Sequence, residues 1–358
     1  MTETFGKTKP RWAAILVALA VGLQLGAHTP PTGTRAEPQA VLDASQPAVI
    51  AFGVMGDLPY SKIDEVHVPH ILKDMHQVGA RLALHVGDIK SSIEPCSEAL
   101  LTHRIALLQA GPLPVVLTPG DNEWTDCHRG LAGRYDPLER LSLLRRLAWP
   151  DPNNPVRPGS NPKPRLGQTN AAQTNAGHQT NAGQTIAAQA MEHQPGQPEN
   201  ARWSIEGLHF VTVHVVGSRN GLEQFPGSDA EMMARMQANA QWLGQTVDLA
   251  LQASAQGLVI AFHADPDFGT PPGRGYQEFQ TLLQDAAQRF KGPILLVHGD
   301  GHRFRVDQPL PGPQGNWPHV TRLEAFGWPR SRHWVLVSFE ARRSPAFRIM
   351  TREASSDR

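Results

Sequence analysis

Short apolar runs alternate with amphipathic stretches from residue 48 onward. Continuous apolar runs bounded by turn residues predict strands, and apolar positions three and four residues apart predict helices. The predicted strands are 48–55, 81–86, 113–117, 208–216, 257–262 and 293–297. Helical spacing follows the first of them through Val66 and Met75, and recurs at 97–108, 136–147 and 229–253. This alternation is typical of an α/β sheet.

The end of the chain has a different rhythm. Three further strand-like runs, near Val320, Val335 and Phe347, follow one another without an intervening helical stretch. Consecutive strands with short connections favour antiparallel pairing. We therefore expect these runs to close the chain in antiparallel fashion.

The apolar pattern is lost over about 151–198, where Pro, Asn, Gln, Gly and Ala dominate. A short unit recurs there, with QTNAA at Gln168, QTNAG at Gln173 and Gln179, and QTIAA at Gln184. The segment has few apolar residues to bury, so we predict a disordered or extended surface insertion. The unit is too short and too polar for the core of a solenoid. The insertion is expected to interrupt one domain spanning 48–352.

The N-terminus has the pattern of an export signal. Basic residues between positions 7 and 11 precede the apolar stretch 12–27. This stretch is short for a membrane span and suits a signal peptide. Cleavage after Ala27 and after Ala36 are both compatible with the small residues there, and an uncleaved anchor is the alternative. We predict a signal peptide or N-terminal anchor over 1–36 and an exported protein, periplasmic or secreted.

Composition limits the classes of partner and fold. The 358 residues carry a formal net charge of zero, which gives no indication of a nucleic-acid partner. Hydrophobic residues make up 40% of the chain, enough for a core, and 31 Pro and 32 Gly indicate long irregular connections. Cys96 and Cys127 are the two cysteines. In an oxidising compartment they are a disulfide candidate, with two separate thiols as the alternative, and their spacing excludes a zinc ribbon.

Potential metal ligands follow five of the predicted strands. They are Asp57, Asp88, Asp121 with Asn122, His263, and Asp300 with His302. The strand ends of an α/β sheet meet at one rim, so residues distant in sequence are expected to gather in one site. Carboxylate oxygens mixed with imidazole suit Mn, Mg, Fe or Zn, and a shared carboxylate can hold two such ions about 3.5 to 4 Å apart.

The order of these segments resembles the signature of calcineurin-like metallophosphoesterases. GD, GD, GD-N-E, H and G-D-x-H stand where that family has D-x-H, GD, GNH-D/E, H and GHxH. The third block reads GDNEW here, and the resemblance covers 48–352 apart from the insertion. It implies a four-layer α-β-β-α sandwich with two mixed β-sheets. It also implies a metal-dependent hydrolase of phosphate esters, either a phosphatase or a phosphodiesterase.

The resemblance further implies a ligand set for two divalent metal ions. Asp57 would bind the first ion, Asp88 would bridge both, and His302 would complete the first set. The second ion would be bound by Asp121 or Asn122, by His263 and by Asp300. A lone Gly-Asp is usually a turn, so the assignment rests on all five blocks together. Asp265 competes with His263 as a ligand.

Three positions depart from the family pattern. Pro59 stands where the family has a metal-binding His, Asn122 where it has a catalytic His, and Asp300 in place of the first His of GHxH. More carboxylates and fewer imidazoles favour harder ions such as Mg or Mn. Asn122 can donate a hydrogen bond but not a proton at physiological pH. Either His128 or His298 then acts in catalysis, or the substrates have good leaving groups.

The predicted reaction is hydrolysis of a small phosphate ester by a metal-activated water. Arg219, Arg305 and His128 are candidate phosphate contacts, because guanidinium matches phosphate oxygens. His298 is alternatively a metal ligand, a partner of a ligand or only the last residue of its strand. The competing interpretation is a binding module for an anionic or phosphorylated ligand, with the same fold and a degenerate centre. Neither a GxSxG elbow nor a phosphate-binding GxxxxGK[ST] loop occurs.

Overall fold

The computed structural model describes residues 49–150, 191–269 and 271–355. They belong to one compact unit. The predicted signal peptide or anchor at 1–36 and most of the predicted insertion lie outside the described residues. Within the described ranges, no helix combines the length and the apolar character that a membrane span requires.

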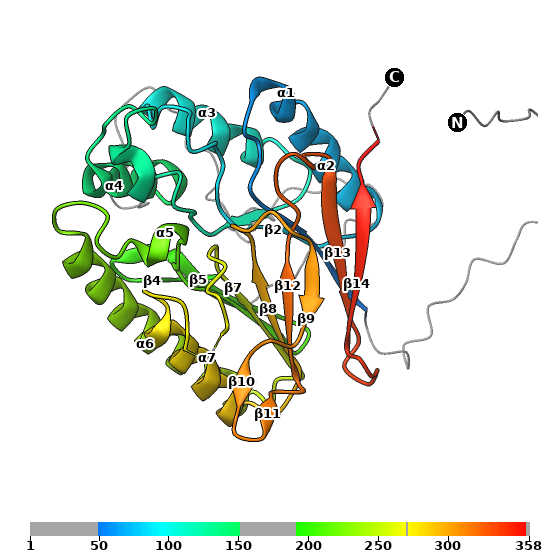
Figure 1. The fold of residues 1–358 in the computed structure, drawn as a ribbon. Helices are drawn as coiled ribbons and strands as arrows, with labels where there is room; N and C mark the ends of the chain where they lie inside the picture. Colours follow the sequence, from blue (N-terminus) through cyan, green and yellow to red (C-terminus); the bar gives the residue numbers. More distant parts are fainter. Residues whose placement is uncertain (1–48, 151–190, 270, 356–358) are drawn as a thin grey trace, which may run out of the picture. The chain divides into compact units, whose positions relative to one another are not determined.

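The first sheet has five strands in the order β14-β13-β1-β2-β3 (Figure 1). Its parallel strands are β1 (Ile50–Met55), β2 (Ala83–His85) and β3 (Val115–Leu117). β13 (His333–Phe339) pairs antiparallel with both β1 and β14 (Phe347–Glu353). The antiparallel closure predicted for these last two strands is confirmed.

The second sheet has seven strands in the order β4-β5-β6-β7-β8-β12-β9. Four are parallel, namely β6 (Leu208–Thr212), β7 (Gly257–Ala261), β8 (Ile294–His298) and β12 (Val320–Glu324). Antiparallel strands at the two edges are β4 (Glu192–Gln194), β5 (Gln197–Ile205) and β9 (Arg305–Asp307). A separate small hairpin consists of β10 (Pro311–Gly312) and β11 (Gly315–Asn316).

Two expectations are corrected in this sheet. β12 lies between β8, to which it is parallel, and β9, to which it is antiparallel, so the run near Val320 does not join β13 and β14 in their antiparallel closure. Residues 192–198, expected at the end of the insertion, instead form β4 and the start of β5. The polar residues of this hairpin find backbone partners at the edge of the sheet, where pairing with a neighbouring strand does not require an apolar sequence.

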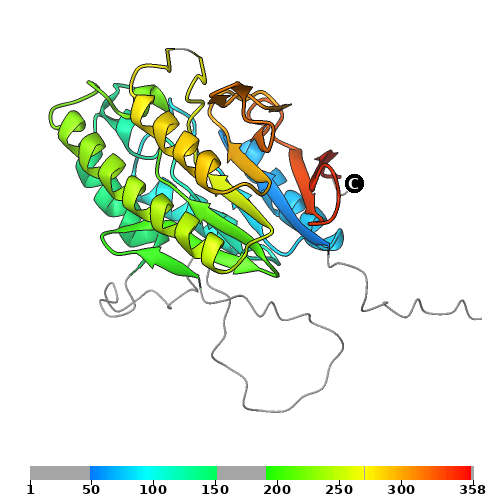
Figure 2. The same ribbon diagram turned by 90° about the horizontal axis from the view of Figure 1, so that it is seen from below.

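The longer helices cover the outer faces of the two sheets, and the short ones lie in the connections. The helices are α1 (Lys62–Glu65), α2 (His67–Gln77), α3 (Glu98–Gln109), the 3-10 helix η1 (Thr125–His128), α4 (Pro137–Ala148), α5 (Gly217–Asn220), α6 (Ser228–Gln252) and α7 (Gln277–Arg289). Ser97 and Asp136 cap α3 and α4 with their side-chain oxygens, as expected for N-cap residues. Figure 2 shows the two long helices α6 and α7 side by side over the second sheet. α7 was not predicted from the sequence.

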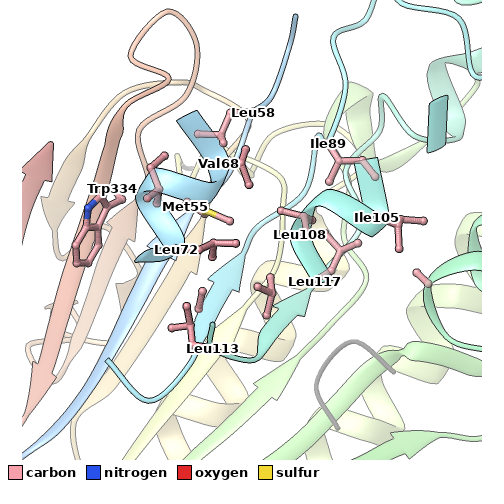
Figure 3. Close-up of a cluster of buried hydrophobic side chains, with 14 of the residues drawn as sticks. Met55, Leu58, Val68, Leu72, Ile89, Ile105, Leu108, Leu113, Leu117 and Trp334 are labelled. Carbon is pink, nitrogen blue, oxygen red and sulfur yellow. The ribbon is translucent and has the colours of Figure 1, made fainter. Parts of the chain in front are cut away.

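Three apolar clusters separate four layers. α2, α3 and α4 pack on the first sheet through residues such as Leu72, Leu108 and Leu117 (Figure 3). Between the sheets, Phe52 of β1 meets Phe210 of β6 edge to face, with ring centroids 5.3 Å apart. α6 and α7 cover the outer face of the second sheet. The predicted four-layer α-β-β-α sandwich is confirmed.

Cys96 and Cys127 form a disulfide with a Cα–Cα distance of 5.7 Å. The disulfide joins the segment just before α3 to η1, and both sulfur atoms lie near the carbonyl oxygen of Asn122, at 3.4 and 3.7 Å. The predicted pairing is therefore confirmed. It holds the segment that follows β3 against the start of α3.

Candidate metal centre

Three acids of the candidate site follow the parallel strands of the first sheet. Asp57 comes after β1, Asp88 after β2 and Asp121 after β3, and these strands are neighbours in the sheet. Parallel strands end at the same edge, so the three side chains converge there. All three are buried, with 0%, 3% and 6% of their surface exposed. Asp57 and Asp88 have φ values of 53° and 57°, a left-handed conformation that is costly for residues other than Gly and concentrates at functional sites.

The second sheet supplies the remaining residues. His263 follows β7, and Asp300 and His302 follow β8. The backbone N–H of Asp300 donates to the Asp57 carboxylate at 3.1 Å, which ties the two sheets together at this edge. Asp300 and His302 also have positive φ, at 70° and 58°. Residues from both sheets thus meet, as the order of the sequence blocks predicts.

The side chains form two overlapping groups of possible metal ligands. One contains Asp57, Asp88 and His263, and the other contains Asp121, His263 and Asp300. Within each group the ligand atoms lie within 4.8 Å of one another. Nε2 of His263 is 3.2 Å from Oδ1 of Asp121, 3.5 Å from Oδ1 of Asp88 and 3.8 Å from Oδ1 of Asp300. One imidazole is therefore shared by both groups.

Backbone carbonyls orient the two histidines. Nδ1 of His263 is 2.7 Å from the Val86 oxygen, and Nδ1 of His302 is 3.0 Å from the Trp328 oxygen. A carbonyl only accepts, so each Nδ1 carries the proton and each Nε2 points toward the acids. Nε2 of His302 lies 3.5 Å from Oδ1 of Asp57. Metal-binding histidines use the same arrangement, with one ring nitrogen donating to the protein and the other facing the ion.

Buried negative charge dominates the electrostatics of the site. Burial raises the pKa of Asp88 well above its usual range, and Asp121 adds to this against the opposing effect of His263. Burial likewise raises the pKa of Asp300 to about 6. Although burial opposes it, the charge of Asp88 and the hydrogen bond with Asp121 raise the pKa of His263. A divalent cation would compensate these carboxylates, so the donor set fits one.

Two glycines permit the acids to approach this closely. A Cβ at Gly120 would lie 2.0 Å from Oδ1 of Asp88, and one at Gly299 would lie 2.4 Å from Oδ2 of Asp57. Such contacts are far inside van der Waals distance, so any side chain at either position would displace a candidate ligand. The glycines of the GD and GDxH blocks are thus required by the geometry of the site.

Asn122 and Tyr60 hold Asp88 from two sides. The Asn122 backbone N–H donates to Oδ1 at 3.0 Å and its side-chain amide donates to Oδ2 at 2.5 Å. The Tyr60 hydroxyl donates to the same Oδ2 at 2.9 Å and lies 3.2 Å from Nε2 of His302. Sequence analysis missed Tyr60, although it stands in GDLPY beside Pro59, where the family pattern has an imidazole.

A second polar group missed by sequence analysis supports Asp121. The Ser218 hydroxyl donates to Oδ2 of Asp121 at 2.6 Å and lies 3.1 Å from Oδ1 of Asp126. Arg129 pairs with Asp126 and donates to the Ser218 oxygen at 3.1 Å. Burial raises the pKa of Asp126 to about 7, and Asp121 adds to this. The only available sequence signal was the position of these residues in GDNEWTDCHR and GSRN.

Comparison with known proteins gives distant structural likeness only. No family model matches the chain, and no curated protein sequence matches it. A dimetal phosphatase from Danio rerio is 12% identical, with a TM-score of 0.44 and coverage of 86% of this chain and 99% of its own. The Plasmodium inner membrane complex anchor is 10% identical, with a TM-score of 0.42 and coverages of 86% and 90%. A purple acid phosphatase from yellow lupin (Lupinus luteus) seeds is 12% identical, with a TM-score of 0.40 and coverages of 86% and 54%.

The two histidines predicted to act in catalysis have their contacts elsewhere. Nδ1 of His128 is 2.7 Å from the Thr125 oxygen, and its ring packs on Phe225 with centroids 6.0 Å apart. His298 stacks on Phe262 at 5.4 Å, and burial lowers its pKa to about 4. Among the described residues, neither imidazole makes a hydrogen bond or ion pair with the acids of the two ligand groups.

The two arginines predicted to contact phosphate already lie next to carboxylates of the protein. Arg305 forms ion pairs with Asp265 and Glu324. Arg219 is 44% exposed and lies 3.7 Å from Glu223. The ion pair between Arg305 and Asp265 also explains why Asp265 does not replace His263 as a candidate metal ligand, since the Asp265 carboxylate is turned toward Arg305.

Proposed function

We propose that this site binds two divalent metal ions and hydrolyses phosphate esters. The observation that carries the proposal is the shared His263, which follows β7 and faces two groups of buried or half-buried acids at the ends of four other strands. Three features support it: the order of the sequence blocks, the left-handed backbone at Asp57 and Asp88, and the surplus of buried negative charge.

Each side chain has a proposed place. Asp57 and His302 would help to hold one ion and Asp121 and Asp300 the other, and Asp88 and His263 would be available to both. The buried acid-rich donor set favours Mn or Mg over softer ions. Divalent ions of this kind lower the pKa of a bound water and neutralise charge on phosphoryl oxygens. All four carboxylates of the ligand groups are fixed by donors of the chain: Asp57 by the Asp300 N–H, Asp88 by Asn122 and Tyr60, Asp121 by Ser218, and Asp300 by the Asp265 N–H.

The leaving group receives little help from imidazole. Asn122 stands where the family pattern has the catalytic His, and its amide is engaged with Asp88. General acid catalysis contributes typically 10²- to 10⁴-fold to a rate. We therefore propose that the preferred substrates are small phosphate esters with good leaving groups. The presence of Asn122 in place of a catalytic His also favours the alternative function, in which the site binds an anionic ligand without cleaving it.

The test is metal analysis of the purified full chain followed by assays of p-nitrophenyl phosphate and bis-p-nitrophenyl phosphate. Activity is measured after chelation and after addition of Mn, Mg or Zn. We expect chelation to abolish turnover and Mn or Mg to restore it. Stoichiometric metal without turnover of either ester would favour the binding module. Absence of both metal binding and turnover would refute the proposed centre.

We also propose that the protein acts outside the cytoplasm. The apolar N-terminal stretch after basic residues and the Cys96–Cys127 disulfide both suit export, because disulfides persist in oxidising compartments.

A further inference from the structure

A cleft of about 680 Å³ begins at the edge of the candidate metal centre. His302 lines it, and Nε2 of the same ring lies 3.5 Å from Oδ1 of Asp57. The cleft continues between the segment after β8 and the ends of β13 and β14, strands that lie side by side in Figure 1. A molecule held at the metal centre could therefore extend past His302 into this space.

The charge of the cleft is positive. Three arginines line it, Arg303, Arg330 and Arg352, against one acid, Glu353. Arg352 is 3.3 Å from Asp74, and Glu353 is 3.4 Å from Arg332, so both already have partners. Arg303 and Arg330 are exposed and form no ion pair with any residue that the structure describes. Two guanidinium groups are thus available to an anion beside a centre that is itself rich in acids.

The wall of the cleft is aromatic. The rings of Phe304 and Phe326 stack with centroids 4.9 Å apart, and the Arg330 guanidinium lies 5.6 Å from the Phe326 centroid. Stacking on the ring limits the freedom of the guanidinium while leaving its N–H groups free to donate. An arginine held in this way is suited to bind a phosphate at a fixed distance from the metal centre.

We propose that this cleft binds the leaving-group part of a phosphate ester that carries a second phosphate. The inference rests on the proposed function and narrows its substrate class to compounds with two phosphates on one organic skeleton. One phosphate is held at the metal centre, and the second is bound by Arg303 and Arg330. Free guanidinium groups bind phosphate through paired hydrogen bonds, which a substrate with a single phosphate leaves unused.

The first experiment measures binding alone, on the metal-loaded full chain at a low temperature that slows turnover. Calorimetry compares adenosine 5′-monophosphate with adenosine 3′,5′-bisphosphate, which differ by one phosphate. We expect the bisphosphate to bind about tenfold more tightly, the factor that corresponds to about 1.4 kcal/mol. The double variant Arg303→Gln/Arg330→Gln should lose this difference. The matched control is Arg342→Gln, an exposed arginine in the loop between β13 and β14, and it should keep it.

The second experiment measures the ratio of KM values for the two compounds with the metal-loaded protein. In wild type the bisphosphate should have the lower KM, and the double variant should bring the ratio to about one. Equal affinity of wild type for the two compounds, or an equal loss in Arg342→Gln, would overturn the cleft proposal. If the bisphosphate binds more tightly but no ester is hydrolysed, the proposed function fails and the cleft assignment stands. If esters are hydrolysed without any preference for the second phosphate, the cleft assignment fails and the proposed function stands.

Discussion

Replacing Asp88 by Asn tests the centre most directly. The carboxylate accepts from the Asn122 backbone, the Asn122 amide and the Tyr60 hydroxyl, at 3.0, 2.5 and 2.9 Å. An amide keeps the shape but places an NH₂ group against donors in either orientation. It also removes one carboxylate charge from the ligand group of Asp57, Asp88 and His263. Changes in residues that only orient ligands already cost 10- to 100-fold in metal affinity, so we expect a loss of about 100-fold or more.

The expected effect on stability follows from linkage. At a metal concentration of 100 times the dissociation constant, binding stabilises the folded state by about 2.7 kcal/mol. A 100-fold weaker site at the same concentration retains only about 0.4 kcal/mol. With a shift in Tm of roughly 2 to 4 °C per kcal/mol, wild type should gain roughly 5 to 11 °C on addition of Mn²⁺ and the variant about 1 °C. Hydrolysis of p-nitrophenyl phosphate should be lost together with the stabilisation.

Differential scanning calorimetry with and without Mn²⁺ measures this difference. The matched control is Asp64→Asn, a buried acid of α1 that accepts from Ser61 and lies outside both ligand groups. It should keep the full metal-induced rise in Tm. An Asp88→Asn protein that is stabilised by Mn²⁺ as strongly as wild type would refute the role of this carboxylate as a metal ligand. Turnover at the wild-type rate would do the same.

Two further predictions concern residues around the centre and in the core. Tyr60→Phe removes a donor to Asp88 and should weaken Mn²⁺ binding by about 10- to 100-fold in calorimetric titration; unchanged affinity would exclude an orienting role for the hydroxyl. Burial opposes ionisation of Glu199, but the hydrogen bond from His214 and the charge of Arg145 outweigh it and lower its pKa from 4.5 to about 2. This depressed pKa contributes roughly 3 kcal/mol of stability that is present above pH about 4.5 and is lost as the pH falls toward about 2. Urea unfolding across this range should show that loss in wild type and a flatter profile in Glu199→Gln, whereas parallel profiles would contradict it.

Local sequence was sufficient for the strands that position the site. The apolar runs before Asp57, Asp88 and His263 are buried on both faces, so the strands read as continuous apolar segments that end in polar residues. The convergence of the strand ends then followed from the parallel order. α7 was missed, although Phe279, Leu283 and Ala286 are at helical spacing and form its buried face. The helical spacing of these apolar residues was present in the sequence, within a segment that also contains many glutamines.

The sequence by itself determined the α/β alternation, the single cysteine pair available for a disulfide and the acids at the strand ends, because each depends on local pattern or on a choice among few residues. Only the tertiary structure decided which side chains surround them. The Tyr60 hydroxyl meets His302 across 242 residues of sequence, and Arg305 is taken up by Asp265 and Glu324. Such pairings depend on how the two sheets stack and on the direction of each side chain. A contact between distant segments is a property of that packing, and no local pattern encodes it.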